Sequence, residues 1–277
     1  MTFWMGAAAA QPEADDRPVE DAKKHKLAVK AEGNLPTVYL IGDSTVKVGT
    51  PSQRGWGDEL APFFNTDKIN VVNHAIGGRS SRTFQTEGRW DASLAMMKKG
   101  DFLLIQFGHN DTGAINDDKR ARASLKGTGG ETEEIDNILT KRHEVVHTFG
   151  WYLRKYVREA KAKGVVPVIC SPIPRKSWQD GKINRVSGSY GKWAREVAEQ
   201  EGALFIDLNE IIAREYEKLG PEKVEPLFAD KGTHTSFDGA KLNARCVVAG
   251  LRGLAGKPFD ANLSEEGLAV PPFVEEK

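Results

Sequence analysis

The sequence TVYLIGDSTV, residues 37–46, predicts a buried strand that ends abruptly at a serine. Its first five residues are apolar, β-branched or aromatic, which is typical of a short strand covered on both faces. Gly42 and two small polar residues then end the run, so Ser44 is expected at the carboxyl end of the strand. Ligands of open α/β sheets bind at that end. Ser44 is therefore a candidate nucleophile, with the alternative that Asp43 and Ser44 only turn the chain or cap a helix.

Four further runs have the composition of strands and alternate with helical patterns. We expect the strands at residues 68–73, 101–107, 165–170 and 203–207, and helices that include 53–64, 144–163, 190–201, 209–219 and 237–251. Residues 112–141 are polar, Gly-rich and charged, so they are expected to form a long loop over one rim. Strands that alternate with helices favour a parallel, doubly wound sheet with helices on both faces. The predicted fold class is α/β with five parallel strands.

The composition excludes several classes of partner. Among 277 residues there are 39 Lys+Arg and 39 Asp+Glu, so the net charge is zero and favours neither nucleic acid nor an anionic membrane. There is no apolar run of about 18 residues that would predict a membrane span. The two cysteines, Cys170 and Cys246, lie in apolar runs and are expected as small buried side chains, with a disulfide as the alternative. The absence of clustered Cys and His makes a structural zinc site unexpected.

The chain divides into one domain between two polar ends. Residues 1–34 are expected to be a leader, 35–255 the domain and 256–277 a Pro-containing tail. Residues 1–11 are apolar and end in small residues, which resembles the back half of a signal peptide without its basic front. This pattern predicts a secreted or periplasmic protein, with an uninformative disordered start as the alternative.

The chemistry-bearing residues follow the predicted strands. Ser44 follows the first strand, the pair Gly77-Gly78 the second and Asn110 the third, and the parallel sheet would bring them to one edge. A late loop, Asp230-Lys231-Gly232-Thr233-His234, adds a carboxylate and a histidine. A serine hydroxyl needs an imidazole to remove its proton, and a carboxylate must hold that imidazole in one tautomer. His234 is the predicted base and Asp230 the acid that orients it.

Acyl transfer also requires donors for the oxygen that becomes negatively charged. The backbone N–H groups of Ser44 and Gly78 and the side-chain amide of Asn110 are the predicted oxyanion hole. Each of these residues has a simpler explanation when taken alone. A glycine pair is more often a turn, and a lone asparagine is more often a loop or Asx-turn residue. A lone histidine could be a surface or a satisfied core residue. Their order along the chain, each at a strand end, favours the catalytic interpretation.

The same motifs resemble a known family. Four blocks, Gly42-Asp43-Ser44, the Gly78 loop, Gly108-His109-Asn110-Asp111 and the late Asp/His loop, resemble the SGNH (GDSL-type) hydrolases. The residues around them resemble the rhamnogalacturonan acetylesterase branch more narrowly: Asn73, Ala75, Gly77-Gly78-Arg79-Ser80, Thr233-His234-Thr235-Ser236 and Gly239-Ala240. This resemblance covers residues 36–251. It implies a flavodoxin-like three-layer α/β/α sandwich and deacetylation of pectic polysaccharide, as in pectin degradation, without a metal or an organic cofactor.

The resemblance also implies roles for the matching residues, with one departure. Ser44 would be the nucleophile, Gly78 and Asn110 would complete the oxyanion hole, and His234 and Asp230 would complete the triad. The family usually has two residues between acid and histidine, whereas here there are three. Gly232 could absorb the extra residue in a turn; otherwise a Ser-His dyad would remain.

Two alternatives belong to other functional classes. His143-Glu144-Val145-Val146-His147 matches the H-E-x-x-H pattern of zinc peptidases, in which two histidines on one helical face bind metal. No convincing third ligand follows, because the available Glu159 is closer to the histidine pair in sequence than the third ligand of glutamate-type zinc enzymes. The preferred interpretation of residues 143–147 is therefore the first turn of a helix. The other alternative is a carbohydrate-binding protein without catalysis, against which the complete set of catalytic residue types argues.

The expected substrate is an acetylated pectic oligo- or polysaccharide, with xylan or a small ester as alternatives. Cationic and aromatic side chains at the rim could attract galacturonate and stack on a sugar ring, or could be no more than a solvated surface. The candidate substrate-binding residues are Arg79, Arg82, Arg175, Lys176 and Trp178.

Overall fold

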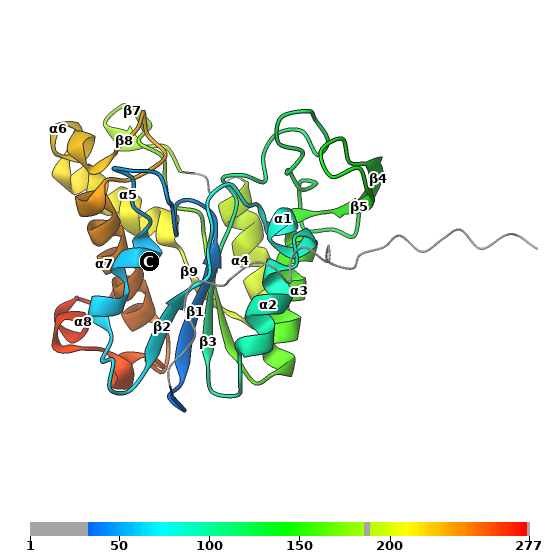
Figure 1. The fold of residues 1–277 in the computed structure, drawn as a ribbon. Helices are drawn as coiled ribbons and strands as arrows, with labels where there is room; N and C mark the ends of the chain where they lie inside the picture. Colours follow the sequence, from blue (N-terminus) through cyan, green and yellow to red (C-terminus); the bar gives the residue numbers. More distant parts are fainter. Residues whose placement is uncertain (1–32, 186–188, 276–277) are drawn as a thin grey trace, which may run out of the picture.

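The computed structural model describes residues 33–185 and 189–275 and has a parallel sheet at its centre (Figure 1). The sheet order is β2-β1-β3-β6-β9, and all four pairings are parallel. Its strands are β1 (Thr37–Gly42), β2 (Asn70–Asn73), β3 (Phe102–Gln106), β6 (Val166–Cys170) and β9 (Leu204–Ile206). The five predicted strands and the α/β class are thereby confirmed. The expected leader, except for its last two residues, lies outside the described residues.

Helices cover both faces of the sheet because neighbouring strand residues point to opposite sides. In β1, Val38 and Leu40 pack with helices α5 and α7, whereas Tyr39 and Ile41 pack with α1 to α4. Figure 1 shows these two groups of helices on either side of the sheet. The helices are α1 (Ser81–Thr86), α2 (Arg89–Met96), α3 (Phe149–Ala162), α4 (Tyr190–Glu201), α5 (Leu208–Leu219), α6 (Pro221–Val224), α7 (Phe237–Gly253) and α8 (Glu265–Ala269).

Two predicted elements differ in the structure. The helix expected at 53–64 is replaced by two 3₁₀ turns, η2 (Trp56–Glu59) and η3 (Ala61–Phe63). Pro62 lacks an N–H group for a continuing helix, and the N–H groups of Trp56 and Gly57 instead bind the carbonyls of Thr45 and Val46. This segment therefore braces the turn that follows β1.

The second difference concerns the helix expected at 144–163, which begins only at Phe149. Residues His143–His147 form strand β5, which pairs antiparallel with β4 (Thr132–Asp136). The segment 112–141, expected to be a loop, thus contains one strand of a hairpin outside the main sheet. A second small hairpin joins β7 (Trp178–Gln179) and β8 (Lys182–Ile183).

The segment from residue 256 onward, expected to be a tail outside the domain at 35–255, instead contributes to the core of the domain. Phe259, Leu263 and Val270 are buried against the α5/α7 side of the sheet, and turns η4 (Glu225–Leu227) and η5 (Asp260–Asn262) lie before and after α7. Cys170 and Cys246 are buried and unpaired, as expected, and burial raises the pKa of the Cys170 thiol to about 12. Within the described ranges, no helix is both long enough and apolar enough to span a membrane.

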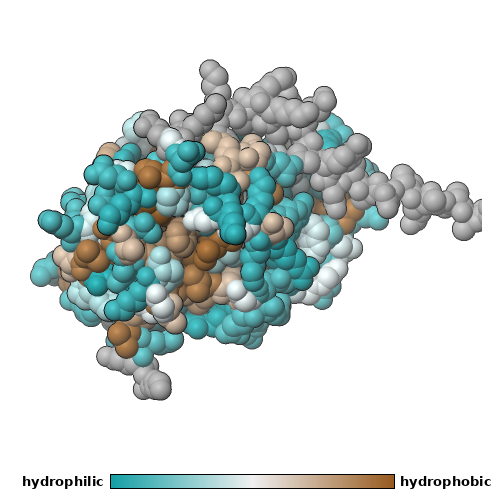
Figure 2. Space-filling model, turned by 90° about the horizontal axis from the view of Figure 1, so that it is seen from below, coloured by the Kyte–Doolittle hydropathy of each residue, from teal (hydrophilic) through white to brown (hydrophobic). Residues whose placement is uncertain are grey.

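The two ends of the sheet differ in role. The chain leaves each parallel strand at the end drawn uppermost in Figure 1, where the loops carrying the candidate residues begin. Figure 2 shows the molecule from below, where hydrophilic side chains surround a smaller group of hydrophobic ones. The fold therefore collects the candidate residues at one end.

Candidate active site

Ser44 lies in a tight turn directly after β1. The carbonyl of Asp43 accepts hydrogen bonds from the N–H groups of Val46 and Lys47, both at 3.1 Å, and its carboxylate accepts from the Thr45 N–H at 2.9 Å. A second bond, from the Thr45 hydroxyl to the same carboxylate oxygen, is 2.7 Å long. The turn holds Ser44 at the sheet edge with 8% of its surface exposed. Its position at the carboxyl end of β1 is therefore fixed by this turn.

The structure brings Ser44, His234 and Asp230 into one chain of contacts. Nε2 of His234 lies 2.9 Å from Oγ of Ser44, and Nδ1 lies 2.6 Å from Oδ2 of Asp230. An ionised carboxylate can only accept, so Nδ1 carries the ring proton and donates a hydrogen bond to Asp230. This assignment leaves Nε2 free to accept the Ser44 proton. A serine, a base and an orienting acid in this geometry can perform nucleophilic acyl transfer.

The loop of Asp230 accommodates the extra residue between acid and histidine. Its Oδ1 accepts the N–H groups of Gly232, Thr233 and His234 at 2.9, 2.7 and 3.0 Å. Gly232 has a φ of 150°, which glycine adopts readily and other residues rarely do. Burial favours the neutral carboxyl, but the three backbone donors and His234 outweigh it and hold the pKa of Asp230 well below its usual range. The departure in spacing therefore does not separate Asp230 from His234.

Thr235 fixes this loop beside the nucleophile turn. The N–H of Arg54 donates to the Thr235 carbonyl, and the Thr235 hydroxyl donates to the Arg54 carbonyl, both at 2.8 Å. Thr235 is 1% exposed, so these bonds are shielded from water. Because Trp56 in turn binds the Thr45 carbonyl, the two halves of the site share one bonded scaffold.

The turn that contains Gly78 packs against Ser44, and Asn110 is hydrogen-bonded to that turn. A Cβ added at the preceding Gly77 would lie 3.5 Å from Cβ of Ser44, and Gly78 has a φ of 84°. The Asn110 amide donates one hydrogen to the carbonyl of Arg79 at 2.9 Å. That bond orients the amide, and the described residues supply no acceptor for its second hydrogen. The arrangement can present fixed donors to a developing negative charge.

His109 supports the nucleophile turn, a role that the sequence reasoning missed although His109 lies in a quoted motif. Its Nε2 is 3.0 Å from the carbonyl of Ile173, and its Nδ1 is 3.3 Å from the Asp43 carboxylate. Both neighbours are oxygen atoms that can accept a hydrogen bond, so the ring lies between the Asp43 carboxylate and the Ile173 carbonyl. Burial raises the pKa of Asp43, but His109 and Thr45 outweigh burial and lower it. The pair ties the Ser44 turn to the loop after β6.

Asp111 is a second buried carboxyl near the site. Its Oδ1 accepts from the Ser81 N–H at 3.1 Å and from the Ser124 hydroxyl at 3.0 Å, and the carboxylate forms no ion pair with the described residues. Burial therefore raises the pKa of Asp111 to about 6, although hydrogen bonds from both serines oppose this. Asp111 links the Asn110 turn to the start of α1.

The candidate substrate-binding residues differ in their exposure and in their partners. Arg79 is partly exposed and pairs with Glu87 at 2.9 Å. Arg175 is exposed and donates to the hydroxyl of Thr233, next to His234. Lys176 pairs with Glu225 at 2.7 Å, and Trp178 is half-buried on the α5/α7 side of the sheet.

Arg82, expected at the rim, is fully buried, so that prediction was wrong. Its guanidinium binds both carboxylate oxygens of Glu144, at 2.6 and 2.7 Å, and the carbonyls of Ile115 and Ala123, both at 2.8 Å. All these partners lie in the segment between β3 and α3. Arg82 thus fixes that segment to α1 and is not available to substrate.

The zinc-peptidase alternative is also wrong, because its motif lies on a strand. Along β5, residues four apart are about 13 Å apart, whereas a helix would bring them to about 6 Å. The His143 ring pairs with Asp136, and the His147 ring stacks on Trp151 with centroids 3.7 Å apart. In the part of the chain that the structure describes, no three His, Cys, Asp or Glu side chains gather as a metal site.

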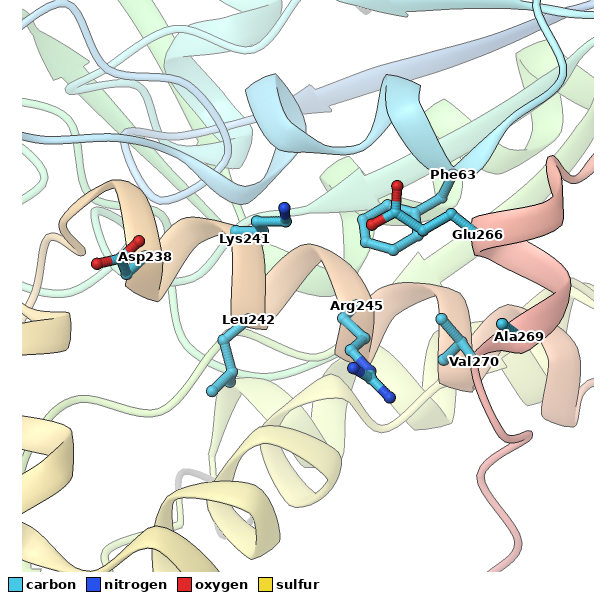
Figure 3. Close-up of a pocket in the computed structure, with 8 residues that line it drawn as sticks. All are labelled: Phe63, Asp238, Lys241, Leu242, Arg245, Glu266, Ala269 and Val270. Atoms are coloured by element: carbon cyan, nitrogen blue, oxygen red, sulfur yellow. The ribbon is translucent and has the colours of Figure 1, made fainter.

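A separate cavity of about 380 Å³ lies between α7, α8 and η3 (Figure 3). It is lined by Phe63, Asp238, Lys241, Leu242, Arg245, Glu266, Ala269 and Val270. None of the candidate catalytic residues is among them. The site at Ser44 is therefore distinct from this cavity.

Serine, histidine and aspartate in contact at the carboxyl edge of a parallel sheet define a serine hydrolase. A family model supports this class and identifies the family within it. The chain belongs to the GDSL-like lipase/acylhydrolase family, whose model matches residues 40–242. It is a carboxylic ester hydrolase, and the alternative of a binding protein without catalysis is set aside.

Curated relatives and solved structures agree with this assignment. A rhamnogalacturonan acetylesterase of Emericella nidulans is 33% identical over 208 residues, which are 75% of this chain and 81% of that one. Rhamnogalacturonan acetylesterase RhgT of Bacillus subtilis is 31% identical over 248 residues, 83% of this chain and 95% of that one. The crystal structure of YxiM from B. subtilis has a TM-score of 0.64 at 27% identity; the match covers 80% of this chain and 58% of that one. Axe2, an acetylxylan esterase from Geobacillus stearothermophilus, shares the fold, with a TM-score of 0.52 at 22% identity over 77% of this chain and 92% of that one.

Proposed function

We propose that this esterase removes O-acetyl groups from rhamnogalacturonan. The contact of 2.9 Å between Nε2 of His234 and Oγ of Ser44 carries the chemical part of the proposal. The substrate part is supported by identity of 31–33% with two rhamnogalacturonan acetylesterases that align over most of their length. Membership of the family alone would support ester hydrolysis but would not identify the substrate.

In the first half of the reaction, Oγ of Ser44 attacks the acetyl carbonyl carbon while Nε2 of His234 takes the hydroxyl proton. The carbonyl oxygen becomes an oxyanion, held by the N–H groups of Ser44 and Gly78 and by the amide of Asn110. The carbon–oxygen bond to the sugar then breaks, and His234 returns the proton to the leaving sugar oxygen. The products are a free sugar hydroxyl and an acetyl group on Ser44.

In the second half, water replaces the sugar. His234 takes a proton from the water, whose oxygen attacks the acetyl carbonyl, and the same donors hold the second oxyanion. The bond between the acetyl carbon and Oγ of Ser44 then breaks, His234 returns the proton to Oγ, and acetic acid leaves and ionises to acetate. Asp230 stays ionised throughout, consistent with its lowered pKa, and stabilises the imidazolium of His234 in both halves.

The proposal is tested by acetate release from a panel of substrates: acetylated rhamnogalacturonan, acetylated xylan and a chromogenic acetyl ester. We expect the highest kcat/KM on rhamnogalacturonan and loss of all three activities in Ser44→Ala. Higher kcat/KM on xylan would instead assign the enzyme to that glycan. Release unaffected by Ser44→Ala would remove the proposed nucleophile.

We further propose that the protein acts outside the cytoplasm, in pectin degradation. A polysaccharide does not cross a bilayer, so the enzyme must meet its polymeric substrate outside, and residues 1–11 have the apolar, small-residue pattern of a signal segment. Fractionation of the producing cells should recover acetylesterase activity in the medium or the periplasm. Activity confined to the cytoplasm would contradict this.

A further inference from the structure

Arg122 lies against the predicted oxyanion hole. Its Nη1 donates to the carbonyl of Gly78 at 2.8 Å, and a Cβ added at Gly78 would come within 3.6 Å of the same nitrogen. The backbone of Arg122 is also held, because the Ser80 hydroxyl donates to the Arg122 carbonyl at 2.6 Å. The segment between β3 and β4 thus carries a guanidinium to the turn after β2. The sequence reasoning did not single out this residue.

The Arg122 guanidinium has no carboxylate partner within the described ranges. Gly78 supplies the one acceptor that it has there, although a guanidinium carries five N–H donors. Arg79, by contrast, pairs with Glu87. Arg122 is half-buried, and burial is the largest cause that lowers the pKa of its guanidinium. Repulsion from Arg120 lowers this pKa further, and Arg79 makes a smaller contribution in the same direction. Arg122 therefore brings to this side of the site a positive charge that forms no ion pair with the described residues.

The carboxylates that attract Arg122 are buried and form no ion pair with it within the described ranges. Asp43 and Asp111 attract Arg122, but both side chains are buried, and their oxygens already accept hydrogen bonds from other groups. Those bonds come from Thr45 and His109 on one side and from Ser81 and Ser124 on the other. A carboxylate that arrives with the substrate would meet a cation whose remaining donors are free among the described residues.

We propose that Arg122 binds a carboxylate of the substrate, on or next to the acetylated sugar ring, and makes the enzyme prefer acidic to neutral acetylated glycans. This inference rests on the proposed function, because it concerns the same site. A carboxylate matches the planar fork of a guanidinium and forms two parallel charge-assisted hydrogen bonds with it. The contact with Gly78 holds the guanidinium beside the place where the acetyl carbonyl must lie. The acidic sugar and the ester would thus be recognised together.

The experiment compares two substrates that differ only at the carboxyl position of each uronate ring: acetylated galacturonate oligosaccharides and the same oligosaccharides after reduction of their carboxyl groups to alcohols. In Arg122→Gln we expect KM for the acidic substrate to rise by about 10- to 100-fold, as for loss of a charged hydrogen-bonded pair. KM for the reduced substrate should rise at least about ten times less, because only the acidic substrate has a carboxylate to pair with Arg122. Arg122→Lys should retain part of the preference. In the wild type, added salt should raise KM for the acidic substrate only.

Arg158→Gln is the matched control, since Arg158 is an exposed arginine of α3 paired with Glu201. It should change neither KM. Thermal unfolding of each variant shows whether it is folded. An equal loss of kcat on both substrates in Arg122→Gln would overturn the inference, since it would mean that Arg122 only positions Gly78. An unchanged KM for the acidic substrate would overturn it as well.

Failure of the proposed function gives a different result. If the wild type releases acetate from acetylated xylan but not from either galacturonate substrate, the assignment to rhamnogalacturonan fails. If it acts on both galacturonate substrates with the same kcat/KM, the assignment stands and the role of Arg122 fails.

Discussion

The carboxylate of Asp230 divides its two oxygens between His234 and its own backbone. Oδ2 lies 2.6 Å from Nδ1 of His234, while Oδ1 accepts three backbone N–H groups of the same loop. Because those donors require an acceptor at Oδ1, the loop also determines which oxygen faces the imidazole. The orientation of His234 therefore depends on the identity of residue 230 as well as on its position.

Asp230→Asn should fold but lose activity. The backbone donors would hold the amide oxygen at the Oδ1 position, so the NH₂ group would face Nδ1 of His234 and force the tautomer with the proton on Nε2. That tautomer cannot accept the Ser44 proton, and kcat should fall by about 10⁴-fold with little change in KM. Steady-state kinetics on a chromogenic acetyl ester measures this. A loss below about tenfold would indicate that Ser44 and His234 work as a dyad.

Asn110→Ala should lower kcat by about 100- to 1000-fold, the usual cost of removing one oxyanion donor. KM should change little, because the bond strengthens as the negative charge develops. Asn116→Ala is a suitable control: Asn116 also donates its amide to a backbone carbonyl, that of Asp136, but in an exposed loop. Equal kcat in both variants would exclude the side chain of Asn110 from the oxyanion hole.

Gly232→Ala should impair both stability and turnover. Alanine is strained at a φ of 150°, and its Cβ would lie 3.2 Å from Cβ and from the carbonyl oxygen of Lys176. Such strain costs about 1–3 kcal/mol and would displace the loop that holds His234. Gly181→Ala, at a φ of 74° in open space, provides the comparison. Urea unfolding should show a loss of stability in both variants, whereas kcat should fall only in Gly232→Ala.

Glu144→Ala should destabilise the fold by about 3–5 kcal/mol, because it leaves the buried guanidinium of Arg82 without its counter-ion. Glu134→Ala, on the exposed strand of the same hairpin, should cost less than about 1 kcal/mol. Urea unfolding of the two variants tests this difference. Similar midpoints would contradict a structural role for the buried pair.

Asp111 should give the wild type a measurable pH dependence of stability. Its pKa is raised from 3.8 to about 6, so between these values the folded state keeps a proton that the unfolded state has lost. Stability should therefore fall as pH rises through this window, by at most about 1.4 kcal/mol per pH unit from this group. In Asp111→Asn that contribution disappears, so the variant should gain stability relative to the wild type from pH 4 to 6. A constant difference in urea midpoints would contradict the raised pKa.

The sequence predicts the sheet well because its information there is local. Strand β1 is an apolar run, and its alternating side chains must be covered on both sides, so the three layers follow from the pattern. Asp230 and His234 are also readable, because they lie four residues apart in one loop. The assignment of Ser44 as the nucleophile required the order of motifs along the whole chain.

What could not be predicted depends on partners far away in sequence. His143–His147 has the spacing of a helix, and only its pairing with the charged residues 132–136 makes it a strand. Arg82 looks like a surface cation until Glu144, 62 residues later, is brought to it. Arg122 gives no sign of its position, because the polar segment around it has no periodicity.

The bond pair between Arg54 and Thr235 has a consequence for how the enzyme matures. The serine turn is encoded early in the chain, but its base arrives only when the segment leading into α7 has bonded to residue 54. A nascent chain without that segment would carry an inert serine. Recovery of esterase activity during refolding should thus mark the docking of this late segment, and partly folded chains would remain unable to cleave esters.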